Sequence, residues 1–205
     1  VVPGGVVEVC RRSDIRLRGE HNVENVLAAS LAALRCGTPL EAIREAVRTF
    51  TGVVHRLEEV GRVDGVLYVN DSIATTPARA VAGLLAFQEP VVLIAGGYDK
   101  HLPFAEFARV AAERCRHIVL LGQTAPAIER ALRQAEEETG RPVSYERVES
   151  FEAAVRAARA AARPGDVVLL SPACASYDMF HNFEERGARF RQMVQAMMQE
   201  AAEKR

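Results

Sequence analysis

Three short polar segments carry the residue types that could do chemistry, and each follows an apolar run. They are residues 70–76 (NDSIATT), 96–101 (GGYDKH) and 171–178 (SPACASYD). Hydroxyls, carboxylates, a lysine and glycines that let a ligand approach backbone amides suit a small anionic or hydroxyl-bearing ligand. The same residue types also end strands and cap helices in proteins with no site there. Three such segments at one sheet edge favour a binding site.

From residue 53 onwards, apolar runs typical of strands alternate with segments of helical period. Strands are predicted over 65–70, 90–95, 117–121, 143–148 and 166–170, and helices over 77–87, 104–115, 125–139, 150–162 and 182–203. This alternation predicts an α/β fold with a doubly wound, mostly parallel sheet. Ligands bind such sheets beyond the carboxyl ends of the strands, which is where the three polar segments lie.

The first fifty residues follow a different pattern. Short β-like runs are predicted over 6–9 and 15–17, and helices over 22–34 and 39–50. Gly37 is a suitable end for the first helix, and Thr38 with Glu41 predicts a capping box for the second. Ser150 is the predicted cap of a later helix. Residues 51–52 are interpreted as a hinge between two parts of the chain.

The composition excludes several classes of protein. The chain of 205 residues is 49% hydrophobic and has a formal net charge of −1, from 26 Lys and Arg against 27 Asp and Glu. These values argue against disorder and against nucleic-acid binding. No apolar run approaches the roughly 20 residues of a transmembrane helix, so no membrane partner is expected. Four scattered cysteines and the lack of a signal peptide predict a cytoplasmic protein.

Several catalytic motifs are missing from the sequence. The chain contains no GxxxxGK(S/T) phosphate loop, no GxGxxG, no GxSxG and no HExxH. We therefore assign no catalytic residue and no metal ligand. The chain begins at Val1 without a methionine, so we expect a fragment or a processed product. Lys100 stands out because only it and Lys204 are lysines among the 26 cations.

Six motifs occur in an order that points to a family. They are GEHNVEN (19–25), HRLE (55–58), NDS (70–72), GG (96–97) followed by Lys100, SPACAS (171–176) and NFEERG (182–187). The set covers residues 19–190 and strongly resembles the Mur ligases of peptidoglycan synthesis, and within them the group that adds D-glutamate. SPACAS and NFEERG are the most specific part of the resemblance.

The resemblance implies domains and an activity. Residues 1–52 would be the C-terminal end of a central ATP-binding domain, and residues 53–205 a Rossmann-like C-terminal domain. The chain would be the C-terminal part of a ligase that uses ATP to join D-glutamate to UDP-N-acetylmuramoyl-L-alanine through an acyl phosphate. The missing N-terminal and central domains, the phosphate loop and the Mg²⁺ ligands would lie upstream, so the isolated chain is expected to be inactive.

The resemblance also implies residues that bind ATP. Asn22 and Asn25 would lie beside the adenine, to which each amide offers a donor and an acceptor. Arg56 and Asp71 would contact the ribose and phosphate region. The structural alternatives are a simple helix cap for Asn22 and an ion pair with Glu58 or Glu59 for Arg56.

Five residues match the D-glutamate site of the family. Lys100 would bind one carboxylate as a point charge. Ser176 and the backbone amides of Tyr177 and Phe183 would hold the other end, and Thr75 completes the set. The alternatives are a solvated loop lysine for Lys100 and core packing for Phe183.

Two differences between related motifs bear on the substrate. Ile73 stands where many D-glutamate ligases have a lysine after Asp-Ser, which leaves Lys100 as the sole lysine of the site. The DNPR motif typical of relatives that add meso-diaminopimelate is absent, which favours D-glutamate. Another Mur or folylpolyglutamate-type ligase, or a nonenzymatic nucleotide-binding Rossmann module, is the alternative.

Overall fold

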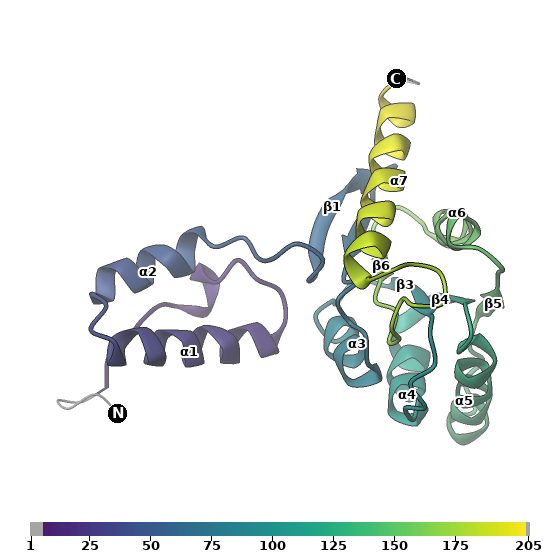
Figure 1. Cartoon of the computed structure of the whole chain (residues 1–205), viewed down its shortest axis with the longest axis horizontal. Helices are drawn as coiled ribbons and strands as arrows, with labels where there is room; N and C mark the ends of the chain where they lie inside the picture. The colour runs from purple at the N-terminus through teal and green to yellow at the C-terminus, as the bar shows by residue number, and fades with distance from the viewer. Residues whose placement is uncertain (1–5, 204–205) are drawn as a thin grey trace. The chain divides into compact units, whose positions relative to one another are not determined.

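The computed structural model describes residues 6–203 (Figure 1). The chain divides into two compact units, Val1–Gly52 and Val53–Arg205, here called unit 1 and unit 2. We describe each by itself.

Unit 1 contains two helices, α1 (Glu20–Arg35) and α2 (Leu40–Thr49), after the 3₁₀ turn η1 (Arg12–Asp14). They confirm the two helices predicted from the helical period. The chain leaves α1 through Gly37, whose φ of +82° favours glycine.

The short strands predicted in unit 1 are wrong. Residues 6–9 and 15–17 form no strand. A strand needs a hydrogen-bonded neighbour, and here the chain between the two runs forms a 3₁₀ turn instead. In that turn the backbone N–H of Arg11 donates to Asp14 at 2.8 Å.

The capping box predicted for α2 is also wrong. Pro39 is the N-cap residue and makes no side-chain cap, because proline carries no hydrogen-bonding side chain. Glu41 forms an ion pair with Arg44 one turn later rather than reaching back to Thr38. The cap predicted at Ser150 is confirmed, since its hydroxyl accepts from the backbone N–H of Ala153.

Unit 2 is built on a six-stranded sheet in the order β1-β2-β6-β3-β4-β5. Strands β2 to β6 run parallel to one another, and the edge strand β1 pairs antiparallel with β2. The predicted α/β fold with a doubly wound, mostly parallel sheet is confirmed. The strands are β1 (Glu58–Val63), β2 (Val66–Asn70), β3 (Val91–Gly96), β4 (Cys115–Leu121), β5 (Tyr145–Arg147) and β6 (Val167–Leu170).

The antiparallel edge strand β1 was not predicted. A bulge between Glu59 and Gly61 breaks the alternation that marks a strand in the sequence. The turn that follows does carry a signal, because Asp64 and Gly65 both have positive φ, as in the tight Asp-Gly turns that join hairpin strands.

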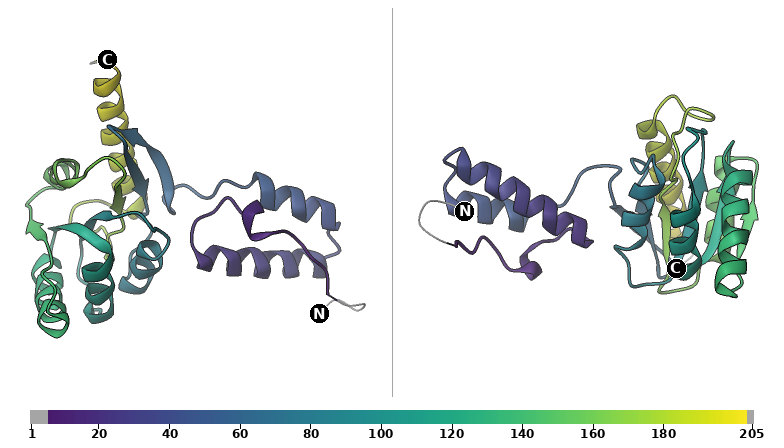
Figure 2. Two further views of the ribbon diagram at one scale, coloured as in Figure 1. Left: turned by 180° about the vertical axis from the view of Figure 1, so that it is seen from behind. Right: turned by 90° about the horizontal axis from the view of Figure 1, so that it is seen from below.

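Helices cover both faces of the sheet (Figures 1 and 2). Apolar residues along β3 alternate between the two cores, with Leu93 in one and Val92 and Ile94 in the other. The first core includes side chains of α3 (Pro77–Leu84), α4 (Ala105–Arg114) and α5 (Ala125–Thr139), and the second those of α6 (Phe151–Ala161) and α7 (Phe183–Glu203). Both faces are therefore buried, which explains the continuous apolar runs of the central strands.

The strand order brings the three polar segments together. Strand β6 lies between β2 and β3, so that Leu170 is in register with Asn70 on one side and Ile94 on the other. Residues 70–76, 171–178 and 96–101 therefore leave three adjacent strands at the same edge of the sheet.

Candidate functional site

The three loops at the carboxyl edge are joined by backbone hydrogen bonds. The N–H of Asp71 donates to Leu170, and the N–H of Gly96 donates to Pro172, each at 2.8 Å. One loop further out, the N–H of Tyr98 donates to Ala175 at 2.9 Å. The edge is thus one hydrogen-bonded surface rather than three independent loops.

The paired glycines of this edge are needed for packing. Gly96 and Gly97 have φ of +120° and +147°. A Cβ on Gly96 would lie 1.9 Å from the carbonyl oxygen of Leu121, and one on Gly97 would lie 2.2 Å from that of Ala175. Glycine at these two positions therefore has an explanation other than ligand access, because backbone atoms of Leu121 and Ala175 already occupy the space that a side chain would need.

Asp71 is the buried carboxylate of the site. Its Oδ2 accepts from the Ser171 hydroxyl at 2.8 Å, and its Oδ1 accepts from the backbone N–H of Leu57 at 3.2 Å. Burial raises the pKa of Asp71 to about 6, although these bonds and the charge of Arg56 lower it. A carboxylate has about four acceptor positions, so these two bonds do not use all of them.

Arg56 lies exposed in a turn of unusual backbone. The residues on either side, His55 and Leu57, have φ of 66° and 45°. The alternative of an ion pair with Glu58 is not what the structure shows, because the Glu58 carboxylate lies 2.7 Å from Arg191. Its other oxygen accepts from the backbone N–H of His55 at 2.9 Å.

The buried side of this turn is a network that sequence reasoning missed. The Asn70 amide nitrogen lies 2.9 Å from Nδ1 of His55 and 3.2 Å from the Gly187 carbonyl. Burial is the main cause that lowers the pKa of His55, which favours the neutral ring. Asn70 and Gly187 stand inside the NDS and NFEERG motifs, so the signal was present but no role was attached to it.

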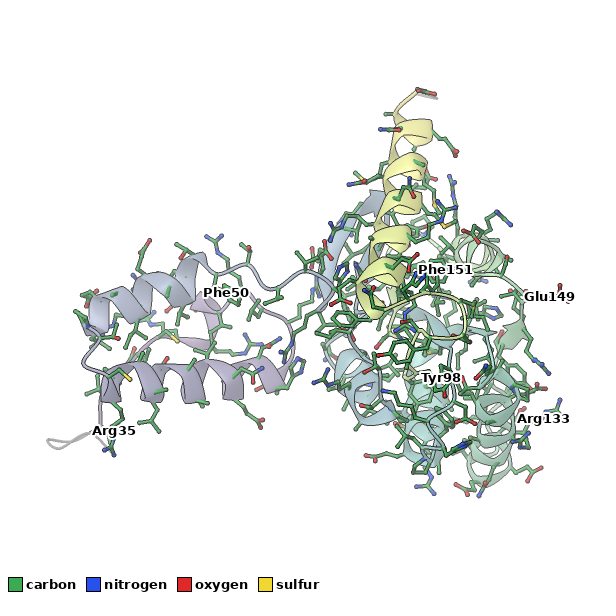
Figure 3. The ribbon with its side chains drawn as sticks, viewed as in Figure 1. Arg35, Phe50, Tyr98, Arg133, Glu149 and Phe151 are labelled. Atoms are coloured by element: carbon green, nitrogen blue, oxygen red, sulfur yellow. The ribbon has the colours of Figure 1, made fainter. Side chains whose placement is uncertain are left out.

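The residues expected to bind D-glutamate differ in exposure. Lys100 is exposed on the loop after β3, Thr75 is half-buried on the loop after β2, and Ser176 is only 2% exposed on the loop after β6. The strand order places these three loops side by side. Tyr98 is labelled in Figure 3. Tyr177 is 65% exposed, and its ring meets that of Tyr98 edge-on with 6.0 Å between the ring centroids.

Phe183 begins helix α7 and is half-buried. Its ring lies edge-on to the ring of His55, with 6.1 Å between centroids, and its carbonyl accepts from the Ser72 hydroxyl at 2.8 Å. The Asn182 side chain caps the helix by accepting from the N–H of Glu185 at 2.7 Å. The contact with His55 accounts for the position of the Phe183 ring. The bond to Ser72 holds the Phe183 backbone beside the loop that follows β2.

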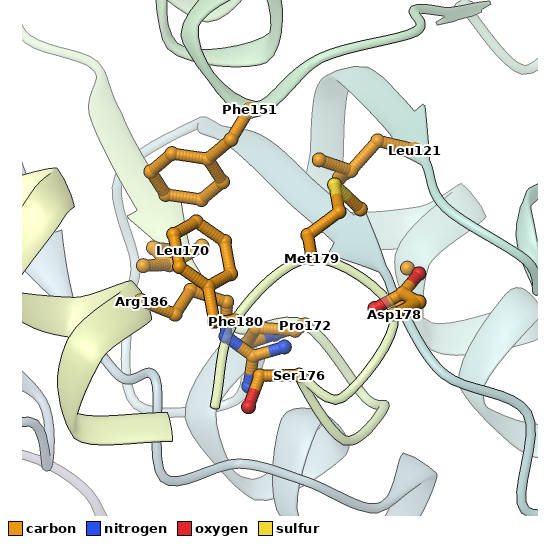
Figure 4. Close-up of a pocket in the computed structure, with 11 residues that line it drawn as sticks. Leu121, Phe151, Leu170, Pro172, Ser176, Asp178, Met179, Phe180 and Arg186 are labelled. Atoms are coloured by element: carbon orange, nitrogen blue, oxygen red, sulfur yellow. The ribbon is translucent and has the colours of Figure 1, made fainter. Parts of the chain in front are cut away.

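A small cavity lies behind the loop that follows β6 (Figure 4). Phe151 and Phe180, which stack edge-on with centroids 5.1 Å apart, lie on one side of it. Arg186 and Ser176 also line it. Sequence reasoning missed Arg186, although it is the arginine of NFEERG.

The two asparagines expected at the adenine lie in unit 1. The Asn22 amide is buried and donates to the carbonyl of Arg18 at 2.7 Å. Asn25 is exposed and donates to Oδ1 of Asn22 at 3.1 Å. The alternative that Asn22 is the helix cap is not borne out, because Gly19 occupies that position.

No cluster of three or more His, Cys, Asp or Glu side chains suited to a metal ion occurs within residues 6–203. Over the same residues, no helix is long and apolar enough to cross a membrane.

The fold is an α/β domain in which three polar loops leave adjacent strands at the carboxyl edge of the sheet. Residues 55–174 match the model of the family described as "Mur ligase, glutamate ligase domain". Because this match covers more than half of the chain, the chain belongs to the Mur ligase family.

Curated relatives carry the name UDP-N-acetylmuramoylalanine–D-glutamate ligase. The one from Acetivibrio thermocellus is 48% identical over 192 residues, which cover 93% of this chain and 41% of that protein. The one from Symbiobacterium thermophilum is 52% identical over 184 residues, which cover 90% of this chain and 40% of that protein. The chain therefore spans about two fifths of the length of these relatives.

Solved structures share the fold at low sequence identity. A murein peptide ligase from Psychrobacter arcticus has a TM-score of 0.56 at 18% identity and covers 89% of this chain and 37% of its own. A folylpolyglutamate synthase from Thermotoga maritima has a TM-score of 0.55, also at 18% identity, and covers 85% of this chain and 39% of its own.

Proposed function

We propose that the chain is the C-terminal part of an ATP-dependent ligase that adds D-glutamate to UDP-N-acetylmuramoyl-L-alanine. Residues 53–205 are the amino-acid domain and residues 1–52 the end of the central ATP-binding domain. The names of relatives that are about half identical over 90% of the chain or more support this. A reaction that consumes ATP and a nucleotide-linked precursor is expected in the cytoplasm.

The observation that carries the proposal is the juxtaposition of loops at the carboxyl edge of the sheet. The loops after β2, β6 and β3 are adjacent, and they carry Thr75, Ser176 and Lys100. D-glutamate has two carboxylates, for which an ammonium group and hydroxyl or amide donors are complementary partners. In this proposal Lys100 binds one carboxylate, and Ser176 with the backbone amides of Tyr177 and Phe183 binds the other.

The chemistry couples two group transfers. The γ-phosphoryl group of ATP passes to the carboxylate of the muramoyl-alanine substrate, which gives an acyl phosphate and ADP. The amine of D-glutamate attacks the acyl carbon, and the tetrahedral intermediate expels phosphate and loses a proton to form the amide. The task of this chain is to position the amine and the nucleotide, an effect that is among the largest in catalysis.

We assign nucleotide contacts to four residues. Arg56 and Asp71 hold its ribose and phosphate region, and Asn22 and Asn25 hold its adenine. Mg²⁺ neutralises phosphate charge when it is bound. Its ligands are assigned to the part of the enzyme that precedes this chain.

The small core of unit 1 supports its assignment to a larger domain. Ile15 and Ile43 are the buried apolar side chains of its described residues. A unit of about fifty residues with so small a core is marginal by itself. The missing part of the central domain would supply the rest of the core.

A fusion enzyme tests the proposal. The matching segment of the Acetivibrio thermocellus relative is replaced by this chain, and ADP release is measured with UDP-N-acetylmuramoyl-L-alanine and one amino acid at a time. We expect release with D-glutamate but not with L-glutamate or meso-diaminopimelate. The isolated chain, which lacks a phosphate loop, is the negative control.

Two outcomes would contradict the proposal. Preference for another amino acid would indicate a different ligase of the family. The rate of ADP release could also be the same with and without each amino acid. In a fusion enzyme whose circular dichroism spectrum matches that of the parent, this result would indicate that the chain is a nucleotide-binding module.

A further inference from the structure

Arg186 is a buried arginine whose hydrogen bonds within residues 6–203 all go to uncharged oxygens. It lies on α7 and is 3% exposed. Its Nε donates to the Ser72 hydroxyl at 2.9 Å, and its Nη2 to the Ser72 carbonyl at 2.8 Å. Its Nη1 donates to the carbonyls of Cys174 at 3.1 Å and Ala175 at 3.3 Å, and Nη2 also reaches Cys174 at 3.2 Å.

This arrangement is unusual for a buried charge. Buried arginines are generally paired with a carboxylate, which offsets part of the cost of removing the ion from water. Within the described residues Arg186 forms no ion pair. Burial lowers its pKa to about 10, so the guanidinium still carries its proton at neutral pH. The fold therefore keeps a charged, planar group where a neutral side chain would be cheaper to bury.

The hydrogen bonds of Arg186 join two of the three loops of the candidate site. Ser72 lies on the loop after β2, between Asp71 and Ile73. Cys174 and Ala175 lie on the loop after β6, directly before Ser176. The carbonyl of Ser72 and that of Cys174 share one Nη2, so the guanidinium fixes the spacing of the two loops.

The same residue also connects both loops to the start of α7. The Ser72 hydroxyl accepts from Arg186 and donates to the carbonyl of Phe183 at 2.8 Å. Phe183 stands one helical turn before Arg186, so its backbone is held to the loop after β2 at a second point. Ser176, Tyr177 and Phe183 are thereby set by one side chain that no ligand needs to touch.

We propose that Arg186 is the positioning residue of the amino-acid site, whose guanidinium sets Ser176 and the amides of Tyr177 and Phe183 to receive one carboxylate of D-glutamate. The inference rests on the proposed function. Its positive charge lies at the carbonyls of Cys174 and Ala175, directly before Ser176, and so further favours an anion there. Lys100 then serves the other carboxylate, so the site needs no second lysine in place of Ile73.

We call the hydrogen bonds of Arg186 to Ser72, Cys174 and Ala175 the clamp. Amide hydrogen exchange on the full 205-residue chain tests whether this clamp holds the two loops, without any substrate. The reporters are the N–H of Tyr98, which bonds to Ala175, and the N–H of Met179, which bonds to Ser176. Arg186→Lys keeps the charge but loses the planar fork, so both amides should exchange at least about tenfold faster. Arg189→Lys is the matched control, because Arg189 is half-buried on the same helix and pairs with Glu152 rather than with the loops, and it should change neither.

Steady-state kinetics of the fusion enzyme test the effect on the site. Arg186→Lys should raise the KM for D-glutamate about tenfold or more. The KM for ATP should rise less than about threefold, because Asp71 keeps its bonds to Ser171 and Leu57. Arg186→Ala leaves a guanidinium-shaped space beside the existing cavity. Low millimolar guanidinium should restore part of its D-glutamate use, whereas a variant that is only destabilised would be harmed further.

The results separate the two proposals. Unchanged exchange at both reporter amides in Arg186→Lys would overturn the clamp, whatever the fusion enzyme does. Equal increases in both KM values, with no rescue by guanidinium, would show a merely structural arginine and overturn the positioning role. If D-glutamate does not increase ADP release by the wild-type fusion enzyme, the proposed function is overturned. The exchange measurement needs no substrate and therefore tests the clamp independently of that function.

Discussion

The backbone N–H of Leu57 donates a hydrogen bond of 3.2 Å to Oδ1 of Asp71. This bond holds a turn in which His55 and Leu57, on either side of Arg56, both have positive φ. Left-handed backbone is costly for residues other than glycine, so it persists only where surrounding contacts enforce it. The carboxylate proposed for the ribose therefore also orients the arginine proposed for the phosphate region.

The raised pKa of Asp71 predicts a pH dependence of stability. Its pKa is about 6 in the folded state against about 3.9 when unfolded, so between these values the folded state binds more protons. Stability contributed by this site therefore rises as pH falls from 7.5 to 4.5. Relative to Asp71→Asn, the wild-type free energy of unfolding should increase by about 2 kcal/mol over that range.

Urea unfolding of the two chains at both pH values measures this change. Tyrosine fluorescence reports unit 2 alone, because all four tyrosines lie there and the chain has no tryptophan. A difference between the chains that stays constant with pH would show that Asp71 does not titrate between the two values.

Asn25 should matter for ATP alone. It is exposed, so its amide is accessible to a ligand, and it is oriented by its bond to Asn22. In the fusion enzyme Asn25→Ala should raise the KM for ATP about 5- to 100-fold, the range for loss of one hydrogen bond that becomes buried when the ligand binds. The KM for D-glutamate should stay nearly constant. Glu24→Gln, the exposed neighbour, is the control, and an ATP KM that does not move would remove Asn25 from the nucleotide site.

Gly96 and Gly140 separate backbone strain from close packing. Both have positive φ, but a Cβ at Gly140 meets nothing within 4 Å, whereas one at Gly96 meets the Leu121 carbonyl. Gly140→Ala should lower the free energy of unfolding by about 1–2 kcal/mol, the cost of left-handed backbone. Gly96→Ala should lower it by about 3 kcal/mol or more, because a clash adds to the strain. Equal losses in urea unfolding would contradict the packing role.

The repeating elements of unit 2 are predictable because their signal is local. Apolar runs and helical periods locate the central strands and the helices, and the carboxyl-end rule places Thr75, Lys100 and Ser176 at one edge. The insertion of β6 between β2 and β3 is set by how helices cover the two faces, which no local pattern encodes. Strand β1 escaped prediction because its bulge at Gly61 breaks the alternation.

Arg186 shows the limit of residue-by-residue reasoning about the site. In the sequence it stands in a run of charged residues at the start of a helix, where arginine is usually solvated. Its burial depends on carbonyls from two loops more than ten and more than a hundred residues away, which only the fold brings together. The same holds for the contact between Leu57 and Asp71.

The central claim is that D-glutamate binds at the edge that carries Lys100. The most direct test is steady-state kinetics of the fusion enzyme with Lys100→Ala, with D-glutamate varied at saturating ATP and UDP-N-acetylmuramoyl-L-alanine. The account predicts a loss in kcat/KM for D-glutamate of roughly 30-fold or more, as expected when one partner of a charge pair that becomes buried on binding is removed. Lys100→Arg should not restore it fully, because a planar fork differs from a compact ammonium. A kcat/KM within about twofold of wild type would contradict the account, since Lys100 would then be a solvated loop residue.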